Sequence, residues 1–154
     1  MRSRIDAVVL PAEPVEFREE VRRMFRDLDR FEGAEPLTGE CVPSIDVYEN
    51  DDGIEICVDL PGVPVDAVRV AAKGGAILIV GHKRPRRTRG DSNFHLVERG
   101  YGRFIRAVRL SAPCDATRAR ATMRDGELRI AVPRVGERRG HAIPIAIATD
   151  TPDA

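Results

Sequence analysis

Residues 119–133 read ARATMRDGELRIAVP, and this stretch decides the fold class. Apolar residues alternate with polar ones on both sides of Asp125-Gly126: Ala119, Ala121 and Met123 before it, and Leu128, Ile130 and Val132 after it. A period of two is typical of half-buried strands, and Asp-Gly between two such runs is a strong signal for a β-hairpin. Pro133 ends the second run because proline has no backbone N–H to donate. We therefore predict an antiparallel pair of strands.

The same pattern recurs upstream through the middle of the chain. Residues 45–58 form two alternating runs around a turn at 49–53, and residues 68–80 form two more around a turn at 73–75. A polar loop at 82–93 precedes two further predicted strands, at 94–97 and 104–110. Roughly six to eight short strands without an intervening helical pattern favour an antiparallel sandwich over a parallel α/β sheet. We predict an all-β fold with one immunoglobulin-like β-sandwich over residues 43–134.

The N-terminal arm, residues 1–42, carries a helical pattern instead. Its apolar residues recur every three or four positions, with charged residues between them: Phe17, Val21, Met24, Phe25, Leu28 and Phe31. This spacing predicts an amphipathic helix that starts near Pro14 and ends near Gly33. The pattern leaves three roles open for the apolar stripe: packing on the same subunit, contact between subunits, or binding of other proteins. The C-terminal tail, residues 135–154, is predicted to be flexible outside an apolar patch at 143–147.

Composition limits the classes of partner. Twenty-five Lys and Arg residues balance twenty-five Asp and Glu residues, so the formal net charge is zero and no global attraction to nucleic acid or to a membrane is expected. The apolar run at 7–10 is too short for a signal peptide, and no stretch approaches the roughly 20 apolar residues of a membrane span. The three cysteines form no C-x-x-C pair. We expect a soluble cytoplasmic protein.

Motifs for catalysis are missing from the sequence. It contains no G-x-S-x-G, no phosphate-binding G-x-x-x-x-G-K-[ST] and no H-E-x-x-H. Its three histidines, His82, His95 and His141, neither cluster with the cysteines nor share a helix face, so no metal site is expected. We predict that the chain is not an enzyme and needs no cofactor. A Cys57 nucleophile with a distant histidine is the remaining enzymatic alternative.

Four short motifs, in order, resemble those of the small heat-shock proteins of bacteria and plants, which share the α-crystallin domain. They are the turn Leu60-Pro-Gly-Val63, the stretch Val97-Glu-Arg-Gly-Tyr-Gly-Arg-Phe104, the hairpin Ala121-Thr-Met-Arg-Asp-Gly-Glu-Leu128 and the tail motif Ile143-Pro-Ile145. The resemblance covers roughly residues 43–147. It implies an ATP-independent chaperone, a holdase that binds partly unfolded client proteins and works as an oligomer of strand-swapped dimers.

The resemblance also implies roles for particular residues. In the family, the loop here at 83–94 pairs with the first strand, here 44–48, of a second subunit. The positions assigned to the dimer interface are Ser44, Val47, Phe94 and Arg106. The tail residues Ile143 and Ile145 would insert into a groove of a neighbouring dimer, and the groove candidates are Val68, Val70, Ala121 and Met123. Ile145 with Ile147 is an alternative docking pair, and an ordinary last strand at 143–147 is another alternative.

The client-binding surface implied for the arm is its apolar stripe, Phe17 to Phe31. Ala119 stands where relatives have a larger aliphatic residue, so we expect a roomier groove beside it. The loop at 83–89 carries five positive charges in seven residues, for which a nucleic-acid patch is the alternative to a mobile swapping loop. The alternative function is that of a co-chaperone or scaffold that binds one specific protein partner.

Overall fold

The hairpin predicted at 119–133 forms one edge of a four-stranded antiparallel sheet in the computed structural model, which describes residues 7–10, 14–32, 39–85, 88–110 and 114–135. The hairpin consists of β7 (Arg120–Arg124) and β8 (Glu127–Pro133). Asp125 and Gly126 both have positive φ, 52° and 77°, which is the backbone that the favoured two-residue hairpin turn requires. The sheet continues through β3 (Gly53–Asp59) to β2 (Ile45–Glu49), in the order β2-β3-β8-β7.

A second antiparallel sheet has the order β1-β6-β5-β4. It is built from β4 (Val68–Lys73), β5 (Ala76–Lys83), β6 (Gly102–Leu110) and the short β1 (Ala7–Val9). Glycines 74 and 75 make the tight turn between β4 and β5 with positive φ. Three short 3-10 helices also occur among the described residues: η1 (Val15–Phe17), η2 (Val65–Ala67) and η3 (Ala116–Arg118).

The two sheets pack face to face around one apolar core. Alternate residues of β3, β5, β6 and β8 point between the sheets, among them Ile56, Ile79, Phe104 and Ile130. Gly81 is needed beside Phe104, because an added Cβ would lie 2.3 Å from the Phe104 ring and 2.7 Å from the carbonyl oxygen of Ala67. The all-β sandwich expected from the alternating pattern is confirmed.

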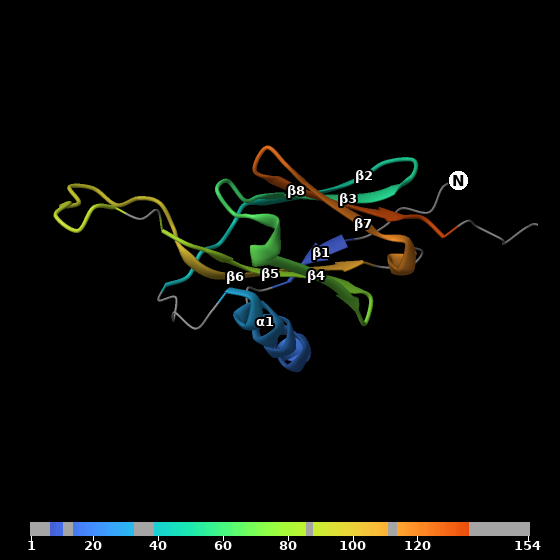
Figure 1. Cartoon of the computed structure of the whole chain (residues 1–154). Coiled ribbons are helices and arrows are strands. Elements are labelled where there is room, and N and C mark those ends of the chain that lie inside the picture. The colour runs from blue at the N-terminus through green and yellow to red at the C-terminus, as the bar shows by residue number, and fades with distance from the viewer. Residues whose placement is uncertain (1–6, 11–13, 33–38, 86–87, 111–113, 136–154) are drawn as a thin grey trace, which may run out of the picture.

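Helix α1 (Arg18–Glu32) forms a third layer on the outer face of the β1-β6-β5-β4 sheet, away from the other sheet (Figure 1). This layer explains the composition of β5, whose residues Ala76 to His82 are all buried. Ile77 and Ile79 face the inter-sheet core, whereas Leu78 and Val80 face α1. A strand covered on both sides needs apolar residues at every position rather than at every second one.

Two segments differ from the expectation. Residues 94–97 form no strand here; they belong to a loop at 88–101, which extends away from the sandwich (Figure 1). Conversely, β1 was not predicted, because three residues are too few to show a period of two. Its partner β6 supplies the hydrogen bonds, with Val8 opposite Arg109.

Candidate protein-interaction surfaces

The four predicted groove residues lie on the edge strands of different sheets. Val68 and Val70 belong to β4, whereas Ala121 and Met123 belong to β7. Their strand partners Gly81, Ile79, Ile130 and Leu128 line the inter-sheet side, so the four side chains lie on the inner margins of the sandwich. Val68 is buried, Met123 is half-buried against the core, and Val70 and Ala121 are exposed. The structure therefore leaves apolar side chains accessible at both edges.

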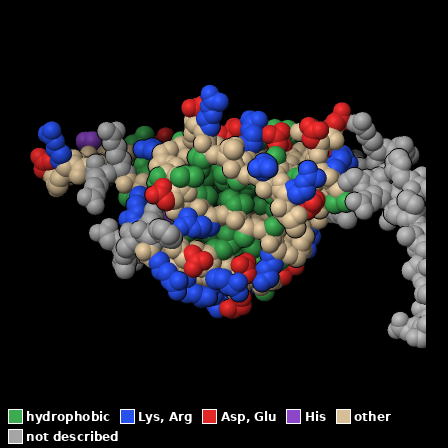
Figure 2. All heavy atoms as spheres, turned by 45° about the vertical axis from the view of Figure 1, so that its right-hand side comes forward, with side chains coloured by type: hydrophobic (Ala, Val, Ile, Leu, Met, Phe, Trp, Pro, Cys, Tyr) green, Lys and Arg blue, Asp and Glu red, His purple; other side chains and the backbone are tan. Residues whose placement is uncertain are grey.

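A hollow in the surface runs along this side of the molecule. Figure 2 shows hydrophobic side chains at its bottom and charged side chains around its rim. Near the β4–β5 turn a cavity of about 470 Å³ is lined by residues of that turn, by Leu110 and Cys114, and by Ala116 and Thr117 of η3. Ala119 is half-buried and packs on the core. The predicted tail occupants, Ile143 and Ile145 or Ile147, lie outside the described residues.

The predicted dimer residues lie on separate elements. Ser44 is exposed, and its carbonyl oxygen accepts a hydrogen bond from the N–H of Asp59. Val47 in β2 is half-buried, and β2 is an edge strand whose outer side has no strand partner among the described residues. Phe94, in the projecting loop, is 70% exposed. The structure of one chain does not bring Phe94 to β2.

Arg106 occupies an unusual position in β6. Its neighbours two residues away, Phe104 and Val108, are buried in the core, and its partner across the sheet is the buried Ile79. The arginine is half-buried on this apolar side, and within the described part of the chain no carboxylate or hydrogen-bond acceptor meets it. Arg106 therefore presents a half-buried positive charge on the inner side of β6.

The apolar stripe of the arm is covered by its own subunit. Phe17, Val21, Met24, Phe25 and Leu28 pack on Ala76, Leu78, Val80 and Ala107 of the sheet. Leu28 has no exposed surface, and the other four are 6 to 7% exposed. Of the three roles left open by the sequence, packing on the same subunit is the one that this structure shows. The Phe31 side chain lies outside what the structure describes.

Acidic residues of the arm form ion pairs with the sheet, and the periodicity of the arm does not by itself indicate these pairs. The Glu20 carboxylate lies 2.9 Å from Lys73 Nζ, Asp29 lies 3.2 Å from the Arg103 guanidinium, and Glu16 pairs with Arg109. The hydrogen bond from Lys73 is the main reason why the pKa of Glu20 is below its ordinary value of 4.5. Glu16 and Glu20 are four residues apart and flank the apolar stripe, and this spacing is a sequence signal for carboxylates at the border of the buried helix face.

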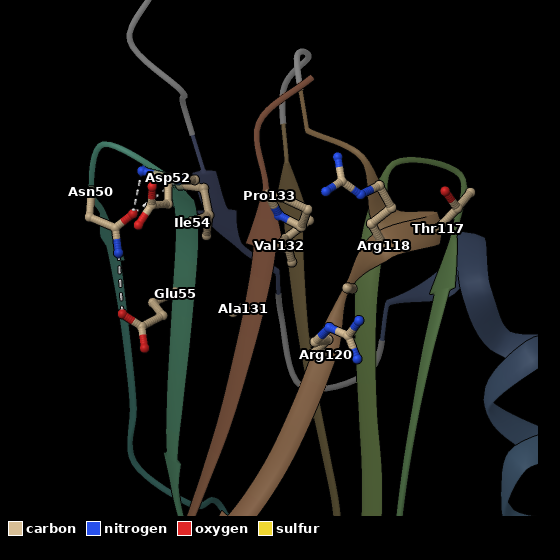
Figure 3. A pocket seen from close by; sticks show the side chains of 12 residues that line it. Asn50, Asp52, Ile54, Glu55, Thr117, Arg118, Arg120, Ala131, Val132 and Pro133 are labelled. Carbon is tan, nitrogen blue, oxygen red and sulfur yellow. Dashed lines mark hydrogen bonds between the residues drawn. The ribbon is translucent and has the colours of Figure 1, made fainter. Parts of the chain in front are cut away.

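A polar hollow of about 600 Å³ lies on the β2-β3-β8-β7 sheet (Figure 3). Asn50 and Glu55 line it from the β2–β3 side, Arg118 and Arg120 from the η3–β7 side, and β8 runs between them. The Asn50 amide donates to Glu55 at 3.3 Å, and its carbonyl oxygen accepts from the backbone N–H groups of Asp52 and Gly53. These bonds shape the β2–β3 turn, so the hollow follows from hairpin geometry.

The thiols and histidines do not form a reactive constellation in the described residues. Burial raises the pKa of the Cys57 and Cys114 thiols, which keeps them protonated and weakly nucleophilic at neutral pH. All three cysteines are free and half-buried. His82 is buried against Phe25, His95 is exposed, and His141 lies beyond the described part. No cluster of three or more metal-binding side chains occurs among the described residues.

None of the helices that the structure describes is long and apolar enough to cross a membrane. The described surfaces consist of apolar edges, a projecting loop and a helix-covered sheet. Together with the sheet topology, they define an α-crystallin-type β-sandwich.

Comparison with known proteins gives the family. The family model of the Hsp20/alpha crystallin family matches residues 46–148, and the chain belongs to this family. Small heat shock protein C4 of Rickettsia felis is 31% identical over 68% of this chain and 64% of its own length. Heat shock protein 16 of Schizosaccharomyces pombe is 34% identical over 64% of this chain and 71% of its own length. The chain thus spans about two thirds of the curated relatives it matches.

Solved structures agree with this assignment. Heat shock protein 16.0 of Schizosaccharomyces pombe is similar with a TM-score of 0.59 and 34% identity, over 70% of this chain and 99% of that one. The hspA protein of Xanthomonas axonopodis is similar with a TM-score of 0.57 and 30% identity, over 61% and 94%. Membership of this family supports a chaperone role rather than an enzymatic one.

Proposed function

We propose that this chain is an ATP-independent holdase that works as an oligomer of strand-swapped dimers. The observation that carries the proposal is the projecting loop at 88–101. It exposes three large apolar side chains, Phe94, Leu96 and Val97, at 64 to 73%. Such a group of exposed apolar residues is typical of a surface that another protein covers.

The open edge of β2 supplies a place for this loop on a second copy. An unpaired edge strand presents free backbone donors and acceptors, and an extended segment can add to it as a further strand. Residues 94–97 of the second copy would pair with β2 beside Val47. Such a contact also brings carboxylates, including Glu98 of the second copy, toward Arg106, whose guanidinium pairs well with them.

The groove between β4 and β7 is the proposed acceptor for the tail of a neighbouring dimer. Pro144 restricts the backbone between Ile143 and Ile145 and so lowers the conformational entropy that docking removes. Burial of each isoleucine contributes about 1.5–3 kcal/mol. A link of this strength allows dimers to exchange.

Oligomer mass tests the assembly. By size-exclusion chromatography with light scattering, we expect the intact chain to exceed a dimer and a truncation before Ile143 to fall to dimers. Substitution of Phe94 and Leu96 by Asp should give monomers, whereas Val65→Asp, a control at a valine that is 67% exposed in η2, should keep the assembly. A monomeric intact chain would reject the proposal and favour the alternative, a scaffold for one specific partner.

Client holding is tested separately. The chain should suppress the heat-induced light scattering of an aggregating client protein at an equimolar ratio and without ATP. Hydrophobic burial supplies the binding free energy, so no nucleotide is required. Unchanged scattering of the client would end the holdase proposal even if the oligomer forms.

A further inference from the structure

The outer face of the β1-β6-β5-β4 sheet is an apolar floor bordered by cations. The floor consists of small and aliphatic side chains: Ala71, Ala76, Leu78, Val80, Ile105 and Ala107. The border consists of Lys73 at the β4–β5 turn and of Arg103 and Arg109 in β6. We refer to these nine residues as the helix-acceptor face. In the described part of the chain, the other members of this apolar cluster come from η1, from α1 and from Leu10.

The present occupant, α1 with the preceding η1, shows what the helix-acceptor face selects. The apolar stripe of the occupant lies on the floor, and three of its acids meet the three border cations. Glu20 pairs with Lys73 at 2.9 Å, Asp29 with Arg103 at 3.2 Å, and Glu16 with Arg109.

The border arginines also contact the apolar stripe itself. The Arg103 guanidinium lies 4.8 Å from the centre of the Phe25 ring, and that of Arg109 lies 5.4 Å from the centre of the Phe17 ring. Cations over aromatic faces are attracted by the ring quadrupole. The border therefore favours an occupant that combines aromatic residues with flanking carboxylates.

His82 extends this face along β5: it is buried, its ring centroid lies 5.6 Å from that of Phe25, and its Nε2 lies 3.7 Å from the Asp29 carboxylate. The floor itself contains no side chain that demands one particular sequence. Its members have neither hydroxyl nor amide groups, and the alanines leave room for a helix to approach closely. Any helix with an apolar stripe at a spacing of three and four residues, flanked by Asp or Glu, meets the same requirements. Surface helices of globular proteins typically carry such an apolar stripe with charged residues beside it, and loss of tertiary packing exposes the stripe.

We propose that the helix-acceptor face is a second client-binding surface, which α1 covers in the resting chain and which takes acid-flanked amphipathic helices of unfolding proteins once α1 leaves. This inference rests on the proposed holdase function. It differs from binding by the arm, because the sheet rather than α1 holds the client.

The covering helix is well suited to leave. A free helix of 15 residues is marginal in water, so α1 depends on the sheet for its stability. While docked, it acts as a tethered competitor with a local concentration on the order of millimolar, which excludes weak ligands. Heat or a stronger helix shifts this competition toward the client.

A covalent bridge tests the proposal in the full chain. Cys41, Cys57 and Cys114 are replaced by Ser, Glu20→Cys and Lys73→Cys are introduced, and a short bismaleimide joins the two new thiols. The control is the same protein capped with N-ethylmaleimide, which removes the same ion pair but leaves α1 free. The probe is a fluorescent peptide with the sequence of residues 14–32.

By fluorescence anisotropy, the capped protein should bind the peptide at least tenfold more tightly than the bridged protein. A peptide in which Glu16, Glu20 and Asp29 are replaced by Lys should bind the capped protein at least tenfold more weakly than the original peptide. Equal peptide binding by the bridged and capped proteins, or equal binding of the two peptides, would overturn the proposal.

A pair of charge changes provides the same test without new cysteines. Asp29→Lys breaks the contact with Arg103 and should raise peptide binding several-fold. The control is Asp27→Lys, which makes the same charge change at an exposed position of α1 that has no ion pair among the described residues. Equal peptide binding by the two variants would contradict the proposal. If all proteins suppress client aggregation but none binds the peptide, the helix-acceptor face fails and the holdase function stands. If none suppresses aggregation, the holdase function fails.

Discussion

Replacing Leu28 by Ala should release α1 from the sheet while the sandwich stays folded. Leu28 has no exposed surface and lies in the cluster that joins α1 to β5 and β6. Truncation of a buried leucine to alanine costs about 2–5 kcal/mol. Because this cluster is separate from the inter-sheet core, the cost falls on the docking of α1. A loss of this size raises the undocked population by roughly 30-fold to several thousand-fold.

Hydrogen exchange measured by mass spectrometry reports this population. The backbone amides of α1 should exchange faster in the variant by that factor, because the undocked helix unravels. Peptides from β3 and β8, which lie in the other sheet, should keep their exchange rates. Arg26→Ala is the matched control, since Arg26 is exposed on the same helix and alanine is a good helix former.

Two results would contradict this prediction for Leu28→Ala. Exchange in α1 that is no faster in Leu28→Ala than in Arg26→Ala would mean that the buried stripe does not hold the helix. A parallel rise in α1, β3 and β8 would mean that helix and sandwich unfold as one unit.

Three further predictions concern other parts of the molecule. Gly81→Ala should lower the free energy of unfolding, measured by urea titration, by about 1–3 kcal/mol, because the added methyl group clashes with Phe104 and the Ala67 carbonyl. In the same titration Gly90→Ala should change this free energy little, because the space around Gly90 is open. The pKa of Glu20 is lower in the docked helix than its ordinary value of 4.5, so ionised Glu20 stabilises the docked helix above pH 4.5. This stabilisation is lost as the pH falls below 4.5 and through the lowered pKa. Dye binding to exposed apolar surface should therefore rise over this pH range in the native chain, and it should rise less in Glu20→Gln. The hydrogen bond of 2.7 Å from the Tyr48 hydroxyl to Glu55 raises the pKa of Tyr48 to about 12, and an ultraviolet titration should show it returning toward 10 in Glu55→Gln.

The three hairpins could be predicted from local sequence because their pattern is local. Alternating side chains, the Asp125-Gly126 turn and the glycines after Lys73 specify strands and reversals within about fifteen residues. The amphipathic helix of the arm was equally readable from its spacing. The groove candidates implied by the family motifs lie on β4 and β7 of these hairpins, whereas Val47 is the one dimer candidate in a hairpin strand. Arg106 lies in β6 and Phe94 in the loop before it.

The position of α1 on the sheet could not be predicted from the sequence, because it depends on contacts between residues far apart in the chain. The apolar run from Ala76 to Val80 indicates only that β5 is buried, and it does not say what covers the strand. The apolar stripe of α1 could equally well pack on a sheet face, on a second subunit or on a client protein. In the structure α1 packs on the sheet of its own chain, where Glu20 contacts Lys73 and Asp29 contacts Arg103. The two residues of each pair are more than fifty positions apart in the sequence.

The all-β sandwich, its hairpins and the presence of the helix follow from the amino-acid sequence, since periodicity and turn chemistry act over short distances. Three features depend on the folded arrangement instead: β1 extends the sheet beside β6, residues 94–97 project as a loop, and the arm covers the helix-acceptor face. The physical reason is that backbone pairing and burial between distant segments depend on the folded arrangement of both partners, which no local pattern contains.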